Sequence, residues 1–330
     1  MIFYFLLEIL ALFSRLDSWA TIFITGAIYS VFGRNDDGFS ISVFRMFCLH
    51  WNIYFCFLLS HWEKYNTGIL NLPWGYDLSM VSSFILYLVT AAGGQQMWSS
   101  LLPGDIPPGP VFEAATYLGN VGMSLPVVLW NLRVAYRDGT GKNRTFLEAI
   151  RPLVATTVAC VLCFIWVLNS QNDVLEKDPR CVFLLTGTIF ANICCKLIIC
   201  QMSNTRSELL SFILAPLALA TAFVTLVPGL SPKSELAVLY GLTFFVIVAH
   251  CHYGTCVVLQ MCDHLHIRPF HIRYAFYALN CRSDRAVLYL FFGAEIINHH
   301  SRYPGSSNSS TNSSAGYQPL STEEDQEPPV

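Results

Sequence analysis

Ionisable side chains stand at the ends of several long apolar runs in this sequence, where chemistry at a membrane surface could take place. Asp17 opens the first run, Glu63 closes the second and Asp77 opens the third. Charged groups at the mouth of an apolar span cost free energy and are by default functional candidates. If they reach one membrane face, they could form a pocket in which a water-soluble substrate meets a lipid; alternatively, they only mark the interface. The candidate pocket residues are His61, Glu63, Lys64, Asn66 and Asp77.

The apolar runs that would position these side chains are long enough to cross a bilayer, since about 20 helical residues span roughly 30 Å of hydrocarbon. Turn-like segments rich in Gly, Pro, Asp and Asn separate the runs. The pattern predicts an all-α, polytopic membrane bundle of about eight transmembrane helices. The predicted spans are 17–33, 40–61, 79–97, 112–132, 152–169, 181–202, 208–229 and 236–261.

Composition supports a membrane protein and excludes several other classes. Apolar residues make up 54% of the 330 residues and charged residues only 12%, whereas soluble domains carry roughly 25% charged residues. The formal net charge is -3, without the excess of basic residues that nucleic-acid binding requires, so we expect no nucleic-acid partner. The 12 cysteines fall mostly inside apolar runs, which indicates reduced packing residues rather than a disulfide framework.

The lysines and arginines outside the spans are distributed unevenly. Thirteen lie on the side that holds the 62–78 loop and four lie on the other side. Because cytosolic loops retain positive charge, this distribution predicts that both termini and the candidate pocket face the cytosol. The sequons at Asn143, Asn308 and Asn312 then face the cytosol as well, so we expect none of them to carry glycan.

A few polar residues fall inside or beside the predicted spans. Lys196 and Arg45 are interpreted as side chains that snorkel toward the interfaces, although they leave open an unrelated carrier or receptor. His250 and His252 are two residues apart and diverge on a helix, which favours a hydrogen bond in the bundle interior over a metal site. Four aromatic residues flank the 62–78 loop and are interpreted as an aromatic belt rather than a stacking site for a base: Trp62, Tyr65, Trp74 and Tyr76.

The two ends of the chain differ in composition from the bundle. Residues 1–16 form a short apolar segment, and 17–261 form the predicted transmembrane bundle. Residues 262–300 are predicted to be cytosolic or interfacial. Residues 301–330 form a Ser-rich, acidic tail that cannot bury enough apolar surface to fold, so we expect it to be disordered.

Four segments stand out by their residue order: LDSWATIFITGAIYSVFGR (16–34), LSHWEKYNTGILNLPWGYD (59–77), GTIFANICCKLIICQMSNTR (187–206) and AHCHYG (249–254). They resemble the eukaryotic amino-alcohol phosphotransferases of the CDP-alcohol phosphatidyltransferase class-I family. The resemblance implies transfer of phosphoethanolamine from CDP-ethanolamine to diacylglycerol, giving phosphatidylethanolamine and CMP in phospholipid biosynthesis. It also implies a Mg²⁺ or Mn²⁺ cofactor and residence in the endoplasmic reticulum or Golgi membrane, with the active face cytosolic.

The family carries the signature D-x2-D-G-x2-A-R-x8-G-x3-D-x3-D, and only its last aspartate has a counterpart here. The counterpart is Asp17, to which the resemblance assigns the roles of proton acceptor and metal ligand. Phe13 stands where the family has the preceding aspartate, and MIFYFLLEILALFS replaces the earlier part. The resemblance therefore implies a form that is incomplete at its N-terminus. Since losing one electrostatic element of a site commonly costs about 10²–10³ in rate, the catalytic competence of this chain is in question.

A second hypothesis follows from this incomplete signature. The chain could be a catalytically inactive form that keeps the bundle and acts as a partner or regulator of a full-length enzyme, in a heterodimer. Under the first hypothesis the partners are CDP-ethanolamine, diacylglycerol and membrane lipid, and the oligomer could be a homodimer.

Overall fold

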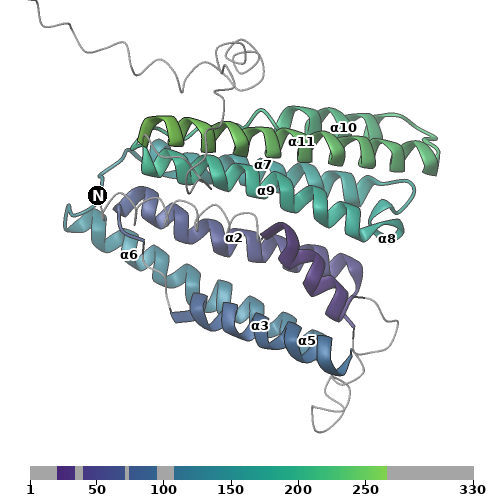
Figure 1. The fold of residues 1–330 in the computed structure, drawn as a ribbon, viewed down its shortest axis with the longest axis horizontal. Coiled ribbons are helices and arrows are strands. Elements are labelled where there is room, and N and C mark those ends of the chain that lie inside the picture. The colour runs from purple at the N-terminus through teal and green to yellow at the C-terminus, as the bar shows by residue number, and fades with distance from the viewer. Residues whose placement is uncertain (1–20, 34–39, 71–73, 95–107, 266–330) are drawn as a thin grey trace, which may run out of the picture. The chain divides into compact units, whose positions relative to one another are not determined.

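The structure is a computed structural model that describes residues 21–33, 40–70, 74–94 and 108–265, without the side chains of 74–80 and 261–265. Every regular element in these residues is helical (Figure 1), as predicted. The first helix is described over Thr21–Phe32. The others are α2 (Val43–Thr67), α3 (Trp74–Gly93), α5 (Pro108–Tyr117), the π-helix η1 (Leu118–Ser124), α6 (Leu125–Arg137), α7 (Phe146–Asn169), α8 (Val174–Lys177), α9 (Pro179–Met202), α10 (Leu214–Leu226) and α11 (Pro232–Leu265).

Each predicted span overlaps a described helix, but the bounds differ, and eight crossings stay a prediction. The span 112–132 is divided among α5, η1 and α6, and α10 is shorter than the span 208–229, whereas other helices are longer than their apolar runs. α2 continues past residue 61 to Thr67, and α7 begins at Phe146 rather than at residue 152. Hydropathy identifies only the part of a helix that is apolar enough for the hydrocarbon layer. The helix itself continues through polar turns until its backbone is capped. For α2 the cap is Gly68, which has a φ of 83° and donates its N–H to the carbonyl of Lys64 at 2.8 Å. A glycine adopts this left-handed conformation without steric cost.

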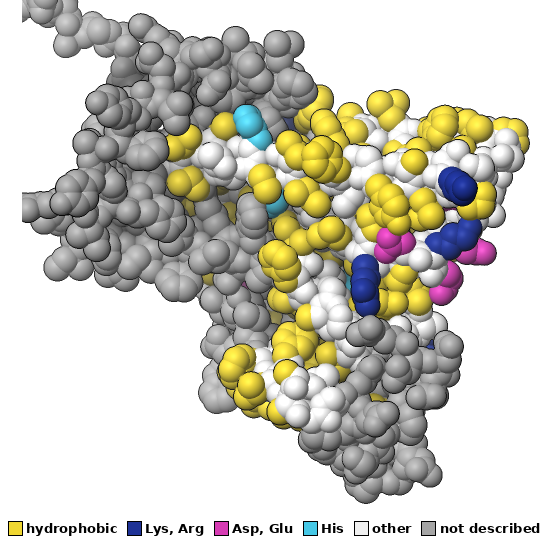
Figure 2. All heavy atoms as spheres, turned by 45° about the vertical axis from the view of Figure 1, so that its right-hand side comes forward, with side chains coloured by type: hydrophobic (Ala, Val, Ile, Leu, Met, Phe, Trp, Pro, Cys, Tyr) yellow, Lys and Arg dark blue, Asp and Glu magenta, His cyan; other side chains and the backbone are white. Residues whose placement is uncertain are grey.

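Four of the described helices are long and apolar enough to cross a membrane. They are α2, α7, α9 and the stretch Pro232–Gln260 of α11. Apolar side chains also cover much of the described surface in Figure 2, where the charged side chains are few and gathered together. A large exposed apolar surface suits a lipid environment rather than water. The described part is therefore that of an integral membrane protein with four candidate spans.

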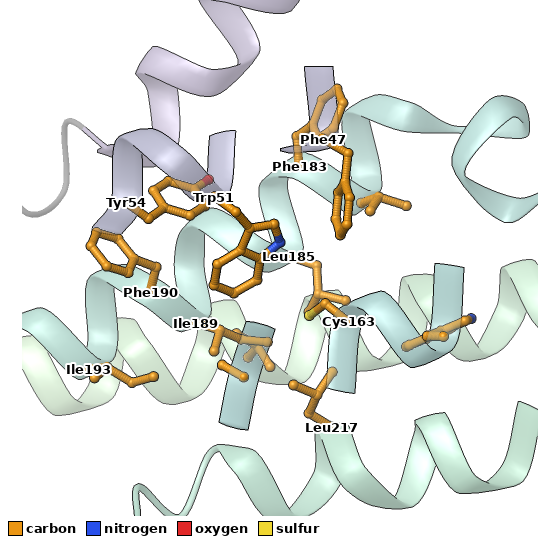
Figure 3. Packing of buried hydrophobic residues seen from close by; sticks show 14 of the residues in the cluster. Phe47, Trp51, Tyr54, Cys163, Phe183, Leu185, Ile189, Phe190, Ile193 and Leu217 are labelled. Atoms are coloured by element: carbon orange, nitrogen blue, oxygen red, sulfur yellow. The ribbon is translucent and has the colours of Figure 1, made fainter. Parts of the chain in front are cut away.

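The core is centred on α9, which packs against α2, α7, α8 and α11. Every residue from Leu185 to Ile198 is buried, as expected for a helix that is apolar on all sides and surrounded by other helices. Figure 3 shows aromatic side chains of α2 beside those of α9, and the rings of Tyr54 and Phe190 stack with centroids 4.5 Å apart. The middle of α2 is thus packed against α9.

Gly187 in α9 allows close approach of two other helices. A Cβ at this position would lie 3.1 Å from the hydroxyl oxygen of Tyr54 and 3.2 Å from Cα of Ile22. We expect Gly187→Ala to lower the free energy of unfolding by about 1–3 kcal/mol, because overpacking a filled core forces neighbours to move. Thermal unfolding of the purified protein in detergent measures the loss. Gly241→Ala in α11 is the control, since nothing lies within 4 Å of its added Cβ; equal losses would contradict the close approach.

Candidate functional site

The structure describes four of the candidate pocket residues fully, and they occupy the last two turns of α2. His61, Glu63, Lys64 and Asn66 lie between residue 61 and the end of the helix at Thr67. Asp77 falls in the first turn of α3, where side chains are not described, and Asp17 lies outside the described residues. Convergence of all these residues on one pocket therefore stays a prediction, which the structure addresses only at the end of α2.

Three of the four side chains point into the protein. Glu63 and Asn66 are each 1% exposed, and His61 is 8% exposed. The carboxylate of Glu63 accepts a hydrogen bond from Nδ2 of Asn131 in α6 at 2.9 Å. The backbone carbonyl of His61 accepts one from Nε2 of Gln201 at 2.6 Å. Such partners stabilise buried polar groups, so these hydrogen bonds hold the Glu63 carboxylate and the backbone at His61 in place.

Asn66 and the neighbouring Trp62 tie α2 to α7. Asn66 donates from Nδ2 to the carbonyl of Trp62 at 2.9 Å, and Trp62 donates from Nε1 to the carbonyl of Ala149 at 2.6 Å. The hydroxyl of Tyr136 approaches Oδ1 of Asn66 at 3.4 Å. The amide of Asn66 is therefore held in one orientation, as a residue that binds a substrate must be.

Tyr65 contacts several segments at this end of the bundle, a role that the sequence did not predict. Its side chain is fully buried, so its interpretation as part of an aromatic belt is wrong. The guanidinium carbon of Arg144 lies 4.0 Å from the ring centroid, and Nε of Arg144 donates to the Tyr65 carbonyl at 3.2 Å. The hydroxyl oxygen of Tyr65 accepts the backbone N–H of Ser207 at 3.3 Å. One side chain thus joins α2 to the loops that follow α6 and α9.

A second polar cluster lies farther inside, between α9, α11 and the loop after α9. Nζ of Lys196 pairs with Oε2 of Glu208 at 2.8 Å, so Lys196 is bound inside the protein rather than snorkelling to water. Nδ2 of Asn192 lies 3.4 Å from Nδ1 of His250, which confirms the predicted interior hydrogen bond. Oγ of Ser211 donates to Oδ1 of Asn192 at 3.4 Å.

Arg45, the other cation inside a predicted span, also has a carboxylate partner. It forms an ion pair with Glu113 of α5. Two buried or half-buried cations that are neutralised within the bundle give no support to a charged transport pathway. The carrier hypothesis therefore loses the observation that motivated it.

Basic residues that the sequence assigned to one membrane side do meet at one end of the bundle. Arg206 pairs with Glu148 at 2.9 Å, and Nζ of Lys142 donates to Oδ1 of Asn204 at 2.8 Å. These contacts join the C-terminal end of α9 to the N-terminal end of α7 and to the loop before it.

The opposite end of the bundle is held by a buried carboxylate. Glu235, at the start of α11, is 1% exposed. It accepts hydrogen bonds from Ser170 at 2.6 Å, Asn172 at 2.8 Å and Trp166 at 3.2 Å. These contacts tie α11 to the C-terminal end of α7.

The described residues do not fit a divalent cation. Within the described ranges no group of three or more His, Cys, Asp or Glu side chains could hold a metal ion. Stable sites for Mg²⁺ or Mn²⁺ need several oxygen ligands. Asp17, the one signature aspartate present, lies outside these ranges, so no chemical step can be derived through a metal here.

The fold and this polar end define a helical integral membrane protein with a buried acid–amide cluster at one end of its helices. Comparison with known proteins adds the family. No family model matches the chain. It is 41% identical over 258 residues to mouse "Ethanolaminephosphotransferase 1", which covers 78% of this chain and 64% of the relative.

More distant relatives share a smaller part of their length. The chain is 27% identical over 245 residues to the Dictyostelium discoideum "Uncharacterized CDP-alcohol phosphatidyltransferase class-I family protein 3", covering 66% of this chain and 60% of the relative. It is 25% identical over 231 residues to Arabidopsis thaliana "Choline/ethanolaminephosphotransferase 1", covering 64% and 59%. Over its matched residues the chain is similar to members of this family, as the sequence motifs predicted. The chain spans 64% of the length of the mouse relative.

Proposed function

We propose that the protein transfers phosphoethanolamine from CDP-ethanolamine to diacylglycerol, giving phosphatidylethanolamine and CMP. The observation that carries the proposal is the 41% identity to mouse "Ethanolaminephosphotransferase 1" over 258 residues. The rigid polar cluster at the end of α2 supports it, because a transferase that joins a nucleotide to a lipid needs fixed polar groups at the membrane surface.

In the proposed reaction the hydroxyl oxygen of diacylglycerol attacks the phosphorus that carries ethanolamine. A new P–O bond forms, the P–O bond to CMP breaks, and Asp17 takes the proton of the hydroxyl. A positioned carboxylate is needed because the pKa of a glycerol hydroxyl lies far above neutral. We propose that His61, Glu63, Lys64, Asn66 and Asp77 line the substrate pocket. The buried hydrogen bonds of Glu63 and Asn66 support this proposal, because they fix the end of α2 against which the substrates would bind.

The rate is expected to be low. Only one aspartate of the family signature has a counterpart here, and each missing electrostatic element commonly costs about 10²–10³ in rate. The assay therefore needs a host without endogenous ethanolaminephosphotransferase activity and a long incubation. Because the resemblance implies a divalent cation, Mn²⁺ or Mg²⁺ is supplied.

Microsomes that contain this chain, given labelled CDP-ethanolamine and diacylglycerol, should produce labelled phosphatidylethanolamine above the vector control. Absence of product above that control rejects the transferase proposal for this chain. A parallel reaction with CDP-choline tests the headgroup; equal products from both nucleotides would contradict a preference for ethanolamine.

We further propose that the chain crosses the endoplasmic reticulum or Golgi membrane eight times, with both termini and the C-terminal end of α2 in the cytosol. The meeting of basic residues at that end of the bundle supports this orientation, because cytosolic loops retain Lys and Arg.

The exposed sequon at Asn143 tests this orientation, since it lies in the loop after α6 at the same end. Under the proposed topology it faces the cytosol, so we expect no glycan when the chain is expressed in mammalian cells. Digestion with an amide-cleaving glycosidase should leave its mobility on a gel unchanged. A sequon-bearing insert in the loop 227–231, at the opposite end, is the positive control and should be modified. Glycan on Asn143 would reverse the orientation.

A further inference from the structure

Three cations meet around the C-terminal end of α2. Lys64 lies in the last turn of the helix, and Lys142 and Arg144 belong to the segment that wraps this turn. The backbone N–H of Lys142 donates to the carbonyl of Asn66 at 2.9 Å. The side chain of Lys142 passes Gly68, where an added Cβ would lie 3.7 Å from Cε of Lys142. The cations are therefore held near one another by the backbone as well as by side chains.

No carboxylate of the described residues pairs with these three cations. The ion pairs at this end join other residues, Arg137 to Asp138 and Arg206 to Glu148. Like charges that share a small region repel one another. Burial and the nearby guanidinium of Arg144 lower the pKa of the Lys142 amine. The cluster therefore carries positive charge that no described carboxylate compensates.

A purely structural role explains only part of this arrangement. Cations stabilise a helix C-terminus, but that end of a helix carries roughly half an elementary negative charge, less than the charge of three cations. Snorkelling explains a single lysine, yet two of these cations are held in place. Arg144 is fixed on the Tyr65 ring, with the guanidinium carbon 4.0 Å from its centroid, and Nζ of Lys142 is held by Oδ1 of Asn204 at 2.8 Å.

We propose that Lys64, Lys142 and Arg144 form a subsite for the diphosphate group of a CDP-alcohol. The inference rests on the proposed function and deepens it by naming the residues that would bind the nucleotide diphosphate. Ammonium groups act as point charges for phosphate, and a guanidinium can donate two parallel hydrogen bonds to phosphate oxygens. Lys64 belongs to the same end of α2 as Glu63 and Asn66, and the N–H of Lys142 donates to the Asn66 carbonyl, so the subsite adjoins the polar cluster of α2.

The test measures binding and does not depend on turnover. The purified chain in phosphatidylcholine nanodiscs is titrated with CDP and, separately, with inorganic diphosphate by isothermal titration calorimetry. We expect Lys142→Gln and Lys64→Gln each to weaken the affinity for both ligands about tenfold, since each removes a charge-assisted hydrogen bond. Lys142→Arg keeps the charge and should retain most of the affinity.

Arg137→Gln is the matched control, because it removes one positive charge at the same end from an exposed residue that pairs with Asp138. It should change the affinity less than twofold. Size-exclusion profiles and unfolding midpoints establish that each variant is folded. If Lys142→Gln does not fold, Lys64→Gln alone tests the subsite. Unchanged affinity in the folded variants overturns the inference.

The two proposals fail in different ways. If labelled phosphatidylethanolamine forms but the substitutions leave diphosphate affinity unchanged, the subsite is wrong and the transferase stands. If the substitutions weaken diphosphate binding but no lipid product forms, the subsite stands and the transferase proposal is rejected for this chain.

Discussion

Replacing Asp17 by asparagine is expected to lower the rate of phosphoethanolamine transfer by about 10²–10⁴, the usual contribution of a positioned general base. Asparagine is close to aspartate in size but cannot take up the proton of the diacylglycerol hydroxyl. Formation of labelled phosphatidylethanolamine by microsomes measures the change, and in the Asp17→Asn variant it should fall to the level of the vector control.

Asp173→Asn is the matched control for this substitution. Asp173 is exposed at the other end of the bundle and has a φ of 51°, a left-handed conformation that asparagine also tolerates. The control makes the same chemical change and should leave the rate within twofold. If Asp17→Asn is as active as Asp173→Asn, Asp17 is not the proton acceptor, although transfer itself would remain established by the product.

The approximate positions of the helices could be predicted from the sequence because a sufficiently long apolar run indicates a membrane-spanning helix. The ends of the helices were predicted less well. α2 and α7 extend beyond their apolar runs, since their ends depend on capping contacts such as the Gly68 N–H to the Lys64 carbonyl. The π-helix η1 was not predicted, because its i→i+5 hydrogen bonds leave no hydropathy signal.

The partners of the polar residues could not be predicted, because they depend on which helices pack together. Glu63 was identified as a candidate from its place at the end of an apolar run, but its contact with Asn131 depends on the packing of α6 against α2. Tyr65 was read as interfacial for the same reason, since only the tertiary fold places Arg144 and Ser207 around it. Residue type thus indicated the candidate residues, whereas packing determined whether each side chain faces the interior.

Lys196 shows this dependence in energetic terms. In the sequence it is a lysine near the end of an apolar run, for which snorkelling is the ordinary interpretation. In the structure its side chain is 11% exposed and pairs with Glu208, which is 30% exposed. Its Nζ also lies 5.7 Å from the ring centroid of Tyr253. A cation in this position cannot lose its partner without leaving a charge in a poorly solvated interior.

We therefore expect Glu208→Leu to lower the free energy of unfolding by about 2–3 kcal/mol. Breaking a fully buried pair costs about 3–5 kcal/mol, and the partial exposure of Glu208 reduces this loss through solvent screening. The double variant Lys196→Met with Glu208→Leu should recover much of the loss, because it leaves no unpaired charge. Reversible unfolding in mixed micelles measures all three free energies.

The pair of Arg137 and Asp138 is the control, because both side chains are exposed, at 72% and 42%. Asp138→Leu should cost less than about 1 kcal/mol, as is usual for surface ion pairs. If Glu208→Leu costs no more than Asp138→Leu, or if the double variant is no more stable than Glu208→Leu alone, Lys196 does not depend on its carboxylate partner. The loop that carries Glu208 also carries Ser207, which binds the Tyr65 hydroxyl. A large loss would then mean that the interior ion pair helps to hold the same loop that supports the polar end of α2.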